Sequence, residues 1–324
     1  MDIAPAIARQ RQFFQSGATH SFDFRRKQLQ KLHNAIQIHE TALITALHLD
    51  LRKSPTEAYA TEIGVVLSEI RHALHHLPSW MKSRRRRAPL LTWPARATLL
   101  FEPYGVVLII GPWNYPLQLL LAPLVGAIAA GNCSILKPSE FAPHTASAIG
   151  ELVAAAFPPE YLTVVSGGRP VAEALLREKF DHIFFTGSTT IGRAVMTAAA
   201  QHLTPVNLEL GGKCPCLVCA DTPINTTARR IVWGKFLNAG QTCVAPDFLL
   251  VDRRVRQELV EAMKRALIEF YGNDPQKSPD YGRIINRKHF DRLAAHLGAG
   301  HVIHGGQHDA ADLFISPTLM TNLS

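Results

Sequence analysis

The chain has 324 residues, of which 47% are hydrophobic and 19% are charged, and this balance excludes an intrinsically disordered protein. The formal net charge is +8, and the run Arg84 to Arg87 supplies four of these eight charges. We expect this run to be a solvated arm or linker and no nucleic-acid interface, because basic and aromatic residues are not interleaved across one face.

The amino-terminal segment lacks the apolar core of a secretion signal, so a cytosolic location is expected. The stretch from Val106 to Leu136 carries no charge, but two prolines within Gly111–Pro116 interrupt it. We therefore predict a buried strand, a turn and a helix, and no membrane span. The odd number of cysteines argues against a disulfide framework and leaves each thiol as a candidate nucleophile. The five are Cys133, Cys214, Cys216, Cys219 and Cys243.

The first eighty residues predict helices, over 22–50 and 55–77, with Pro78 ending this block. Residues 84–102 predict an exposed arm or hairpin that becomes β-like at Ala97–Phe101. From Val106 onward, short apolar runs alternate strictly with helical segments. The predicted strands are 106–110, 134–136, 162–165, 182–185 and 206–210, and the predicted helices between them are 117–130, 146–157, 171–179 and 191–202. This pattern predicts a doubly wound parallel sheet, in which ligands bind beyond the carboxyl ends of the strands.

A second α/β pattern follows Gly211-Gly212, where we place a domain boundary. Its predicted strands are 217–218 and 248–251, its helices are 224–239 and 257–271, and residues 301–324 are loop and strand. The fold class is therefore α/β with two domains. Residues 1–210 hold the helices, the arm and a Rossmann-like sheet, and residues 211–324 hold a second, partial α/β domain.

Three residues are candidates for catalysis. Cys243 follows a glycine turn, where a thiol is accessible and its thiolate is the attacking form, although a lone cysteine is more often a small packing residue. Glu209 ends an apolar strand and faces the expected ligand crevice in an apolar setting; pairing with Lys213 is the alternative. Asn114 lies on a proline-flanked turn and could donate to an oxyanion, or could be an ordinary turn residue.

A phosphate-binding turn is the fourth candidate. Phe184 to Arg193 runs from a strand through a Gly-Ser-Thr turn into a helix, and free N–H groups at a helix N-terminus bind phosphates. The pattern is not G-x-G-x-x-G and is weak by itself. Lys137, at the end of the second strand, could reach a ribose or a phosphate.

Together and in this order, the segments GPWNYP, LKPSE, FFTGST, LELGGK and GQTC closely resemble the aldehyde dehydrogenase superfamily. The short N-terminus and the segments WGKF, GQTCVAPD and YGRII resemble its class-3 branch. The resemblance implies an NAD(P)-binding domain in residues 1–210 and a catalytic thiol domain in residues 211–324. It also implies an aldehyde substrate and NAD or NADP as cofactor.

The resemblance assigns a role to each candidate residue. Cys243 matches the nucleophile, Glu209 the general base, and Asn114 the oxyanion donor, working with the backbone N–H of Cys243. The residues that match cofactor-binding positions are Lys137, Glu140, Gly187, Ser188, Gly192 and Gly211. The implied reaction passes through a hemithioacetal and a thioester on Cys243. Relatives that pass the thioester to coenzyme A lack a carboxylate at the position of Glu209, so its presence favours hydrolysis to an acid.

Two further expectations concern what the chain lacks. Cys214, Cys216 and Cys219 lie on and beside one strand with alternating faces, so we expect structural roles and no metal site. Members of the superfamily continue past the position of Ser324, so we expect a fragment or truncated reading frame with a compromised homodimer. The alternative function is a catalytically inactive remnant or nucleotide-binding module of the same fold.

Overall fold

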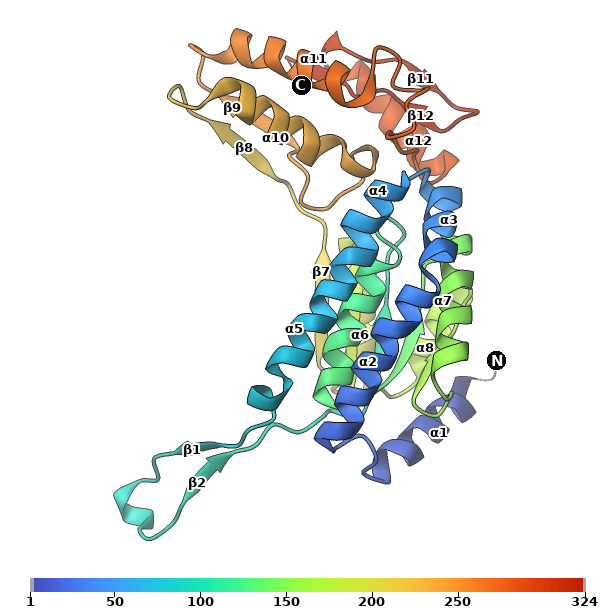
Figure 1. Cartoon of the computed structure of the whole chain (residues 1–324), viewed down its shortest axis with the longest axis vertical. Helices are drawn as coiled ribbons and strands as arrows, with labels where there is room; N and C mark the ends of the chain where they lie inside the picture. The colour runs from blue at the N-terminus through green and yellow to red at the C-terminus, as the bar shows by residue number, and fades with distance from the viewer. Residues whose placement is uncertain (1–2, 323–324) are drawn as a thin grey trace. The chain divides into compact units, whose positions relative to one another are not determined.

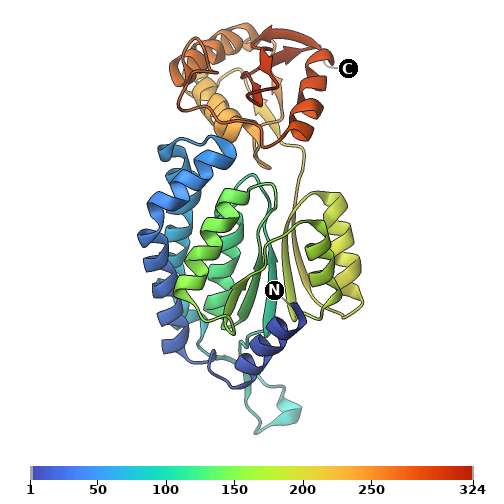
Figure 2. The same ribbon diagram turned by 90° about the vertical axis from the view of Figure 1, so that its right-hand side faces the viewer.

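A five-stranded sheet in the order β5-β4-β3-β6-β7 forms the centre of the larger part of the chain (Figure 2). Its strands are β3 (Val106–Ile110), β4 (Cys133–Lys137), β5 (Leu162–Val164), β6 (His182–Gly187) and β7 (Val206–Leu210). The pairings of β3 with β4 and β6, and of β4 with β5, are parallel, and every residue of β3 and β4 is buried. This is the strand order of a Rossmann sheet. In such a sheet the ligand crevice lies beyond the carboxyl ends of the strands, where the strand order reverses, which is here between β3 and β6. The predicted doubly wound sheet is confirmed.

Helices between the strands complete the α/β pattern. They are α6 (Gln118–Ala130), α7 (Pro143–Ala156), α8 (Arg169–Arg177) and α9 (Thr189–Ala200). The first of them, α6, packs on β3 and β4, and α9 packs on β6. Gly131 ends α6 in the left-handed conformation, with φ 90°, as its position predicts. The uncharged stretch is therefore a strand, a turn and a helix, and no helix within residues 3–322 is long and apolar enough to cross a membrane.

The amino-terminal residues are helical, with boundaries that differ from the prediction. The elements are α1 (Ile3–Gln15), α2 (Phe22–Ile38), α3 (Glu40–Leu51), α4 (Pro55–Ala58), a π-helix (Tyr59–Ile63) and α5 (Gly64–Trp80). A break at His39 divides the predicted helix over 22–50 into α2 and α3. The prediction that Pro78 ends the second helix was wrong. The last turn closes around Pro78 because Met81 N donates to Leu77 O at 3.1 Å.

The predicted arm is an antiparallel hairpin of β1 (Arg84–Arg86) and β2 (Ala97–Leu99), which extends away from the helices of its unit in Figure 1. A short 3-10 helix (Leu90–Thr92) lies at its tip. The arginines of β1 are exposed, as predicted. The hairpin therefore adds surface to the chain and contributes no core.

The structure describes residues 3–322, and these divide into two units. The first comprises Met1–Leu43, Thr61–Glu140 and Ala146–Glu209, and the second comprises Ile44–Ala60, Phe141–Thr145 and Leu210–Ser324. The second unit thus includes two segments that precede residue 210. The predicted division into an NAD(P)-binding and a catalytic domain stays a prediction.

The second unit has its own small sheets and core. Its elements after residue 210 are β8 (Pro215–Val218), α10 (Ile224–Phe236), a 3-10 turn (Leu237–Gly240), β9 (Phe248–Val251), α11 (Arg256–Tyr271), α12 (Arg287–Ala295), a 3-10 turn (His296–Gly298), β10 (His301–His304), β11 (His308–Asp309), β12 (Phe314–Ile315) and β13 (Leu319–Thr321). Parallel pairing joins β8 to β9, and α10 packs against α11. Val218, Val232 and Met263 belong to the buried core of this unit.

Candidate active site

Cys243 lies on a strained turn of the second unit, residues 238–245, which we call the Cys243 turn. Asn238, Ala239 and Gly240 have φ values of 54°, 51° and 79°, so three successive residues adopt the left-handed conformation. Such backbone is unfavourable for residues other than glycine and persists only where its surroundings fix it. A hydrogen bond from Ala245 N to Thr242 O at 3.2 Å closes the turn around Cys243, whose side chain is exposed. The structure thus presents this thiol to solvent on a backbone held away from its preferred conformation.

Two side chains hold the Cys243 turn in place, Glu57 from a distant segment and Gln241 from the turn itself. The Glu57 carboxylate accepts a hydrogen bond of 2.7 Å from the backbone N–H of the buried Asn238. The Gln241 amide donates to Asn238 O at 3.0 Å and to Arg283 O at 2.9 Å, and its oxygen accepts from Ile285 N at 3.0 Å. Neither anchor had been predicted from the sequence. Both polar side chains satisfy backbone groups that would otherwise lose their hydrogen bonds.

We expect replacement of Gln241 by alanine to loosen the Cys243 turn. The change removes three hydrogen bonds and leaves partly buried backbone groups unpaired, which costs roughly 1–3 kcal/mol in the free energy of unfolding. Thermal melting and the rate of Cys243 alkylation by iodoacetamide measure the two consequences. Gln257→Ala, at an exposed position of α11, is the matched control. If Gln241→Ala had the melting temperature and the Cys243 alkylation rate of wild type, the Gln241 side chain would not be what holds the turn.

The cofactor candidates of the first unit gather at the carboxyl ends of its strands. Lys137 is the last residue of β4, is 3% exposed, and forms an ion pair of 2.8 Å with Glu140. Burial by itself would raise the pKa of Glu140, but the hydrogen bond and the charge of Lys137, with a backbone hydrogen bond, outweigh it and lower that pKa. The pair therefore presents an ammonium and a carboxylate together at neutral pH. That combination can donate to and accept from vicinal hydroxyl groups, such as those of a ribose.

The turn from β6 into α9 has the features of a phosphate site. Ser188 caps α9 by accepting from Ile191 N at 3.3 Å, and the first turn of α9 carries no acidic residue. A Cβ on Gly187 would lie 2.6 Å from Cζ of the Phe185 ring, so a larger residue there would require the ring to move. The buried hydroxyl of Thr186 has no hydrogen-bond partner among the described residues. Thr186 is a candidate that the sequence analysis missed, and its signal was a hydroxyl directly before the turn.

The remaining cofactor candidates carry less structural support. Gly192 is buried on α9. Nothing lies within 4 Å of a Cβ built on Gly211, so no steric reason for glycine is present at that position. The ion pair, the capped turn and the unpartnered hydroxyl nevertheless fit a dinucleotide, with phosphates at the start of α9 and a ribose at Lys137 and Glu140.

Two of the proposed catalytic residues belong to the first unit and Cys243 to the second. Asn114 is half-buried in the bend after β3. Glu209 is exposed near the end of β7, so the expectation of an apolar setting was wrong. The side chains of β7 alternate between half-buried and exposed, and Glu209 falls on the exposed face. Lys213, the alternative partner considered for Glu209, forms an ion pair of 2.9 Å with Asp247.

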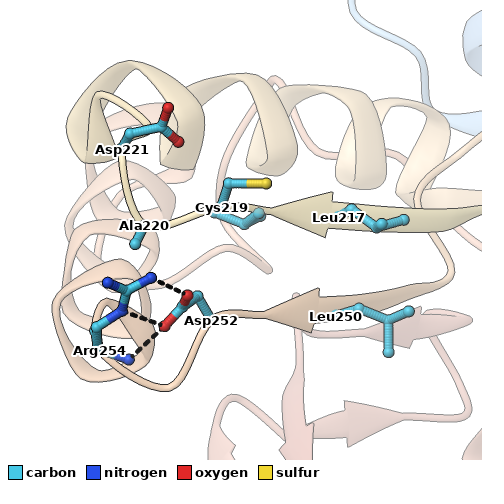
Figure 3. Close-up of a pocket in the computed structure, with 8 residues that line it drawn as sticks. Leu217, Cys219, Ala220, Asp221, Leu250, Asp252 and Arg254 are labelled. Carbon is cyan, nitrogen blue, oxygen red and sulfur yellow. Dashed lines mark hydrogen bonds and ion pairs between the residues drawn. The ribbon is translucent and has the colours of Figure 1, made fainter.

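A cavity of about 480 Å³ in the second unit lies away from Cys243, at the carboxyl ends of β8 and β9 (Figure 3). Asp252 and Arg254 form an ion pair of 2.7 Å beside it, and hydrogen bonds from the Arg254 side chain and backbone lower the pKa of Asp252 to about 2. Cys243 precedes β9, whereas the cavity follows it, and a strand of this length spans about 13 Å. This cavity is therefore distinct from the surroundings of the thiol.

The three cysteines around β8 occupy different environments. Cys216 packs against the core of the second unit, Cys219 is exposed beside the cavity of Figure 3, and Cys214 is half-buried near the Cys243 turn. Within residues 3–322, no three or more His, Cys, Asp or Glu side chains come together as metal ligands would.

The Rossmann strand order, with a capped turn and an ion pair at its carboxyl edge, defines an α/β protein of the dinucleotide-binding class. The chain belongs to the aldehyde dehydrogenase family, whose model, "Aldehyde dehydrogenase family", matches residues 1–324. The members of this family are oxidoreductases that oxidise aldehydes to acids with NAD or NADP. Other relatives are named as members of aldehyde dehydrogenase family 3, which confirms the predicted class-3 resemblance.

Three similar proteins illustrate the relationship. The 4,4'-diaponeurosporen-aldehyde dehydrogenase of Staphylococcus aureus is 45% identical over 314 residues, which are 96% of this chain and 68% of that protein. The dimeric NADP-preferring aldehyde dehydrogenase of Canis lupus familiaris is 44% identical over 321 residues, 99% of this chain and 71% of that protein. A solved structure described as the substrate-bound state of Staphylococcus aureus AldH has a TM-score of 0.97 and 43% identity, and the match covers all of this chain and 71% of that one.

Proposed function

We propose that this chain oxidises an aldehyde to a carboxylic acid through a thioester on Cys243. The observation that carries the proposal is the exposed Cys243 thiol on a turn of three left-handed residues, held by Gln241 and Glu57. A nucleophile must reach its substrate and keep its orientation while it attacks. The anchored turn meets both requirements.

The chemistry at Cys243 has two stages. The thiolate attacks the aldehyde carbonyl and forms a hemithioacetal, whose oxyanion accepts hydrogen bonds from the Asn114 amide and the Cys243 backbone N–H. Bound NAD(P)+ supplies the acceptor for the hydride. The thioester left on Cys243 is then hydrolysed by a water molecule that gives its proton to Glu209. An exposed carboxylate suits this role because water reaches it directly.

The cofactor residues have separate tasks in this proposal. Lys137 and Glu140 hold ribose hydroxyls. Gly187 and Ser188 place the backbone N–H groups at the start of α9 beside the phosphates. Gly192 and Gly211 complete the predicted set through their backbone.

We expect Glu140→Gln to shift the cofactor preference from NAD towards NADP. A carboxylate beside the ribose repels a 2′-phosphate, so removal of its charge changes the ratio of the two dissociation constants by about tenfold. Calorimetric titration with NAD and NADP measures that ratio without requiring turnover. Glu151→Gln, on the exposed side of α7, is the control. An unchanged ratio would remove Glu140 from the cofactor site.

The test of the proposed function is nicotinamide reduction by the purified chain with aliphatic, aromatic and long polyene aldehydes. The polyenes are included because one relative is named 4,4'-diaponeurosporen-aldehyde dehydrogenase. The mass of the protein should also increase by one acyl group at Cys243 during turnover. A folded chain that gives neither signal contradicts the proposal, and NAD binding without either would favour the inactive nucleotide-binding module. A cytosolic location and a homodimer stay predictions.

A further inference from the structure

A second thiol lies against the Cys243 turn and has no part in the proposed mechanism. Cys214 Sγ donates a hydrogen bond of 3.3 Å to the backbone carbonyl of Cys243, although the two residues are 29 positions apart in the sequence. Both are free cysteines of the second unit, and Cys214 is half-buried while Cys243 is exposed. The pair is therefore accessible to small solutes.

Backbone pairing holds the two cysteine residues close together. Asp247 N donates to Cys214 O at 2.9 Å, and the parallel ladder of β8 and β9 starts one residue later with Pro215 opposite Phe248. The carbonyl bonds add at most about 2.8 Å to the 3.3 Å contact, so Cys214 Sγ lies within about 6 Å of Cys243 Cα. The two sulfurs of a disulfide are about 2 Å apart, and rotation about χ1 can turn each sulfur towards the other residue. Rotation of the two side chains with a small movement of the exposed turn can thus bring the sulfurs together.

Charged groups surround the Cys214 side of the pair. Lys235 interacts electrostatically with Cys214 and with Asp247, and Lys213 pairs with Asp247 at 2.9 Å. Burial lowers the pKa of Lys235, and the nearby Asp247 and Cys214 oppose that effect. The ammonium group is a counter-charge for a sulfur that becomes anionic during thiol exchange. Cys216 and Cys219, by contrast, lie on the core face and at the far end of β8.

We propose that Cys214 is the resolving thiol of a reversible oxidation site that it shares with Cys243, with hydrogen peroxide as the oxidant. The Cys243 thiolate attacks one peroxide oxygen, the O–O bond breaks, and sulfenic acid forms on Cys243 while hydroxide leaves and is protonated to water. The Cys214 sulfur then attacks the sulfenic sulfur, an S–S bond forms, and the second oxygen leaves as water. The two thiols together lose two electrons, which reduce the peroxide. The proposal rests on the proposed function only in taking Cys243 as the reactive thiol.

The disulfide would have two effects on the enzyme. It removes the thiol that attacks the aldehyde, so activity stops. It also stops the oxidation of Cys243 before the sulfinic acid, which thiol reductants do not reverse. Cys214 therefore preserves a nucleophile that would otherwise be lost permanently.

The test compares wild type, Cys214→Ser and the control Cys219→Ser after hydrogen peroxide treatment. Free thiols are alkylated before and after reduction with dithiothreitol, and peptide mass spectrometry identifies linked peptides and the oxidation state of Cys243. In wild type and Cys219→Ser, we expect a disulfide between Cys214 and Cys243. We also expect reduction with dithiothreitol to restore alkylation of most of the Cys243 thiol. In Cys214→Ser, we expect at least about fivefold less recovery, with Cys243 found as sulfinic acid.

Several outcomes would overturn the proposal. These are a linkage through Cys216 or Cys219 in place of Cys214, no linkage at all, or equal recovery in Cys214→Ser and wild type. Cys214→Ala repeats the comparison if the serine variant melts below the assay temperature. The proposed function is judged separately. Aldehyde oxidation without the disulfide would refute only this inference, and the disulfide in a chain that oxidises no aldehyde would refute only the function.

Discussion

Aldehyde-dependent formation of NADH or NADPH is expected to fall by at least about 10⁴-fold when Cys243 is replaced by alanine. Without the sulfur, no hemithioacetal and no thioester can form. The Cys243 turn should keep its shape, because its hydrogen bonds come from Gln241, Glu57 and backbone groups and not from the thiol. The melting temperature of the variant should therefore match that of wild type.

A matched variant separates loss of the nucleophile from loss of a reactive surface thiol. Cys219→Ala removes another exposed cysteine of the same unit, at the opposite end of β8. It should keep wild-type turnover. Substantial activity in Cys243→Ala, or equal loss in both variants with intact folding, would disprove the assignment of the nucleophile. Initial rates with one aldehyde and both cofactors, measured beside thermal melts, decide between these results.

Replacement of Glu209 by glutamine should slow hydrolysis of the thioester by about 10²–10⁴-fold and leave its formation almost unchanged. Glutamine has nearly the same size and stays hydrogen-bonding, but it cannot accept a proton from water. A first turnover of nicotinamide reduction should therefore appear as a burst, followed by a much slower steady state. Intact-protein mass spectrometry should find the acyl group on Cys243.

The control for Glu209 is a glutamate with similar exposure in the same unit. Glu151→Gln, on α7, should show wild-type steady-state turnover. Loss of the burst in Glu209→Gln would mean that the carboxylate is needed for thioester formation or for folding, and not for hydrolysis alone. A steady state equal to wild type would show that another group activates the water.

The sequence predicted the sheet well because its signals are local. The strand β3 is a short, wholly apolar run, β4 has an apolar centre at Ile135 and Leu136, and both strands are buried along their whole length. The helix boundaries were predicted less accurately than the strands. Gly168 and Pro170 mark the start of α8 at Arg169, but the apolar pattern placed it two residues later. The helix α12 was missed, although Asn286 caps it by accepting from His289 N at 3.0 Å.

The same contrast between local and long-range signals applies to the residues of the candidate site. Cys243, Lys137 and Gly187 could be proposed from the sequence because each stands directly beside a turn or a strand end. The support of the Cys243 turn was not found, because Glu57 and Asn238 are 181 residues apart and no local pattern links them. The apolar setting expected for Glu209 failed for a related reason. The apolar neighbours of Glu209 along β7 do not determine which face of the strand its side chain occupies.

The same long-range anchor bears on how the protein folds. The hydrogen bond between Glu57 and Asn238 closes a loop of most of the chain, and entropy makes such closures late events compared with pairing of neighbouring strands and helices. The three left-handed residues before Cys243 gain the support of Glu57 only when that closure is complete. Helical signal and aldehyde-oxidising activity should therefore return at different times during refolding, with the activity last. A chain that has recovered its helices but not this closure would still be an inactive protein.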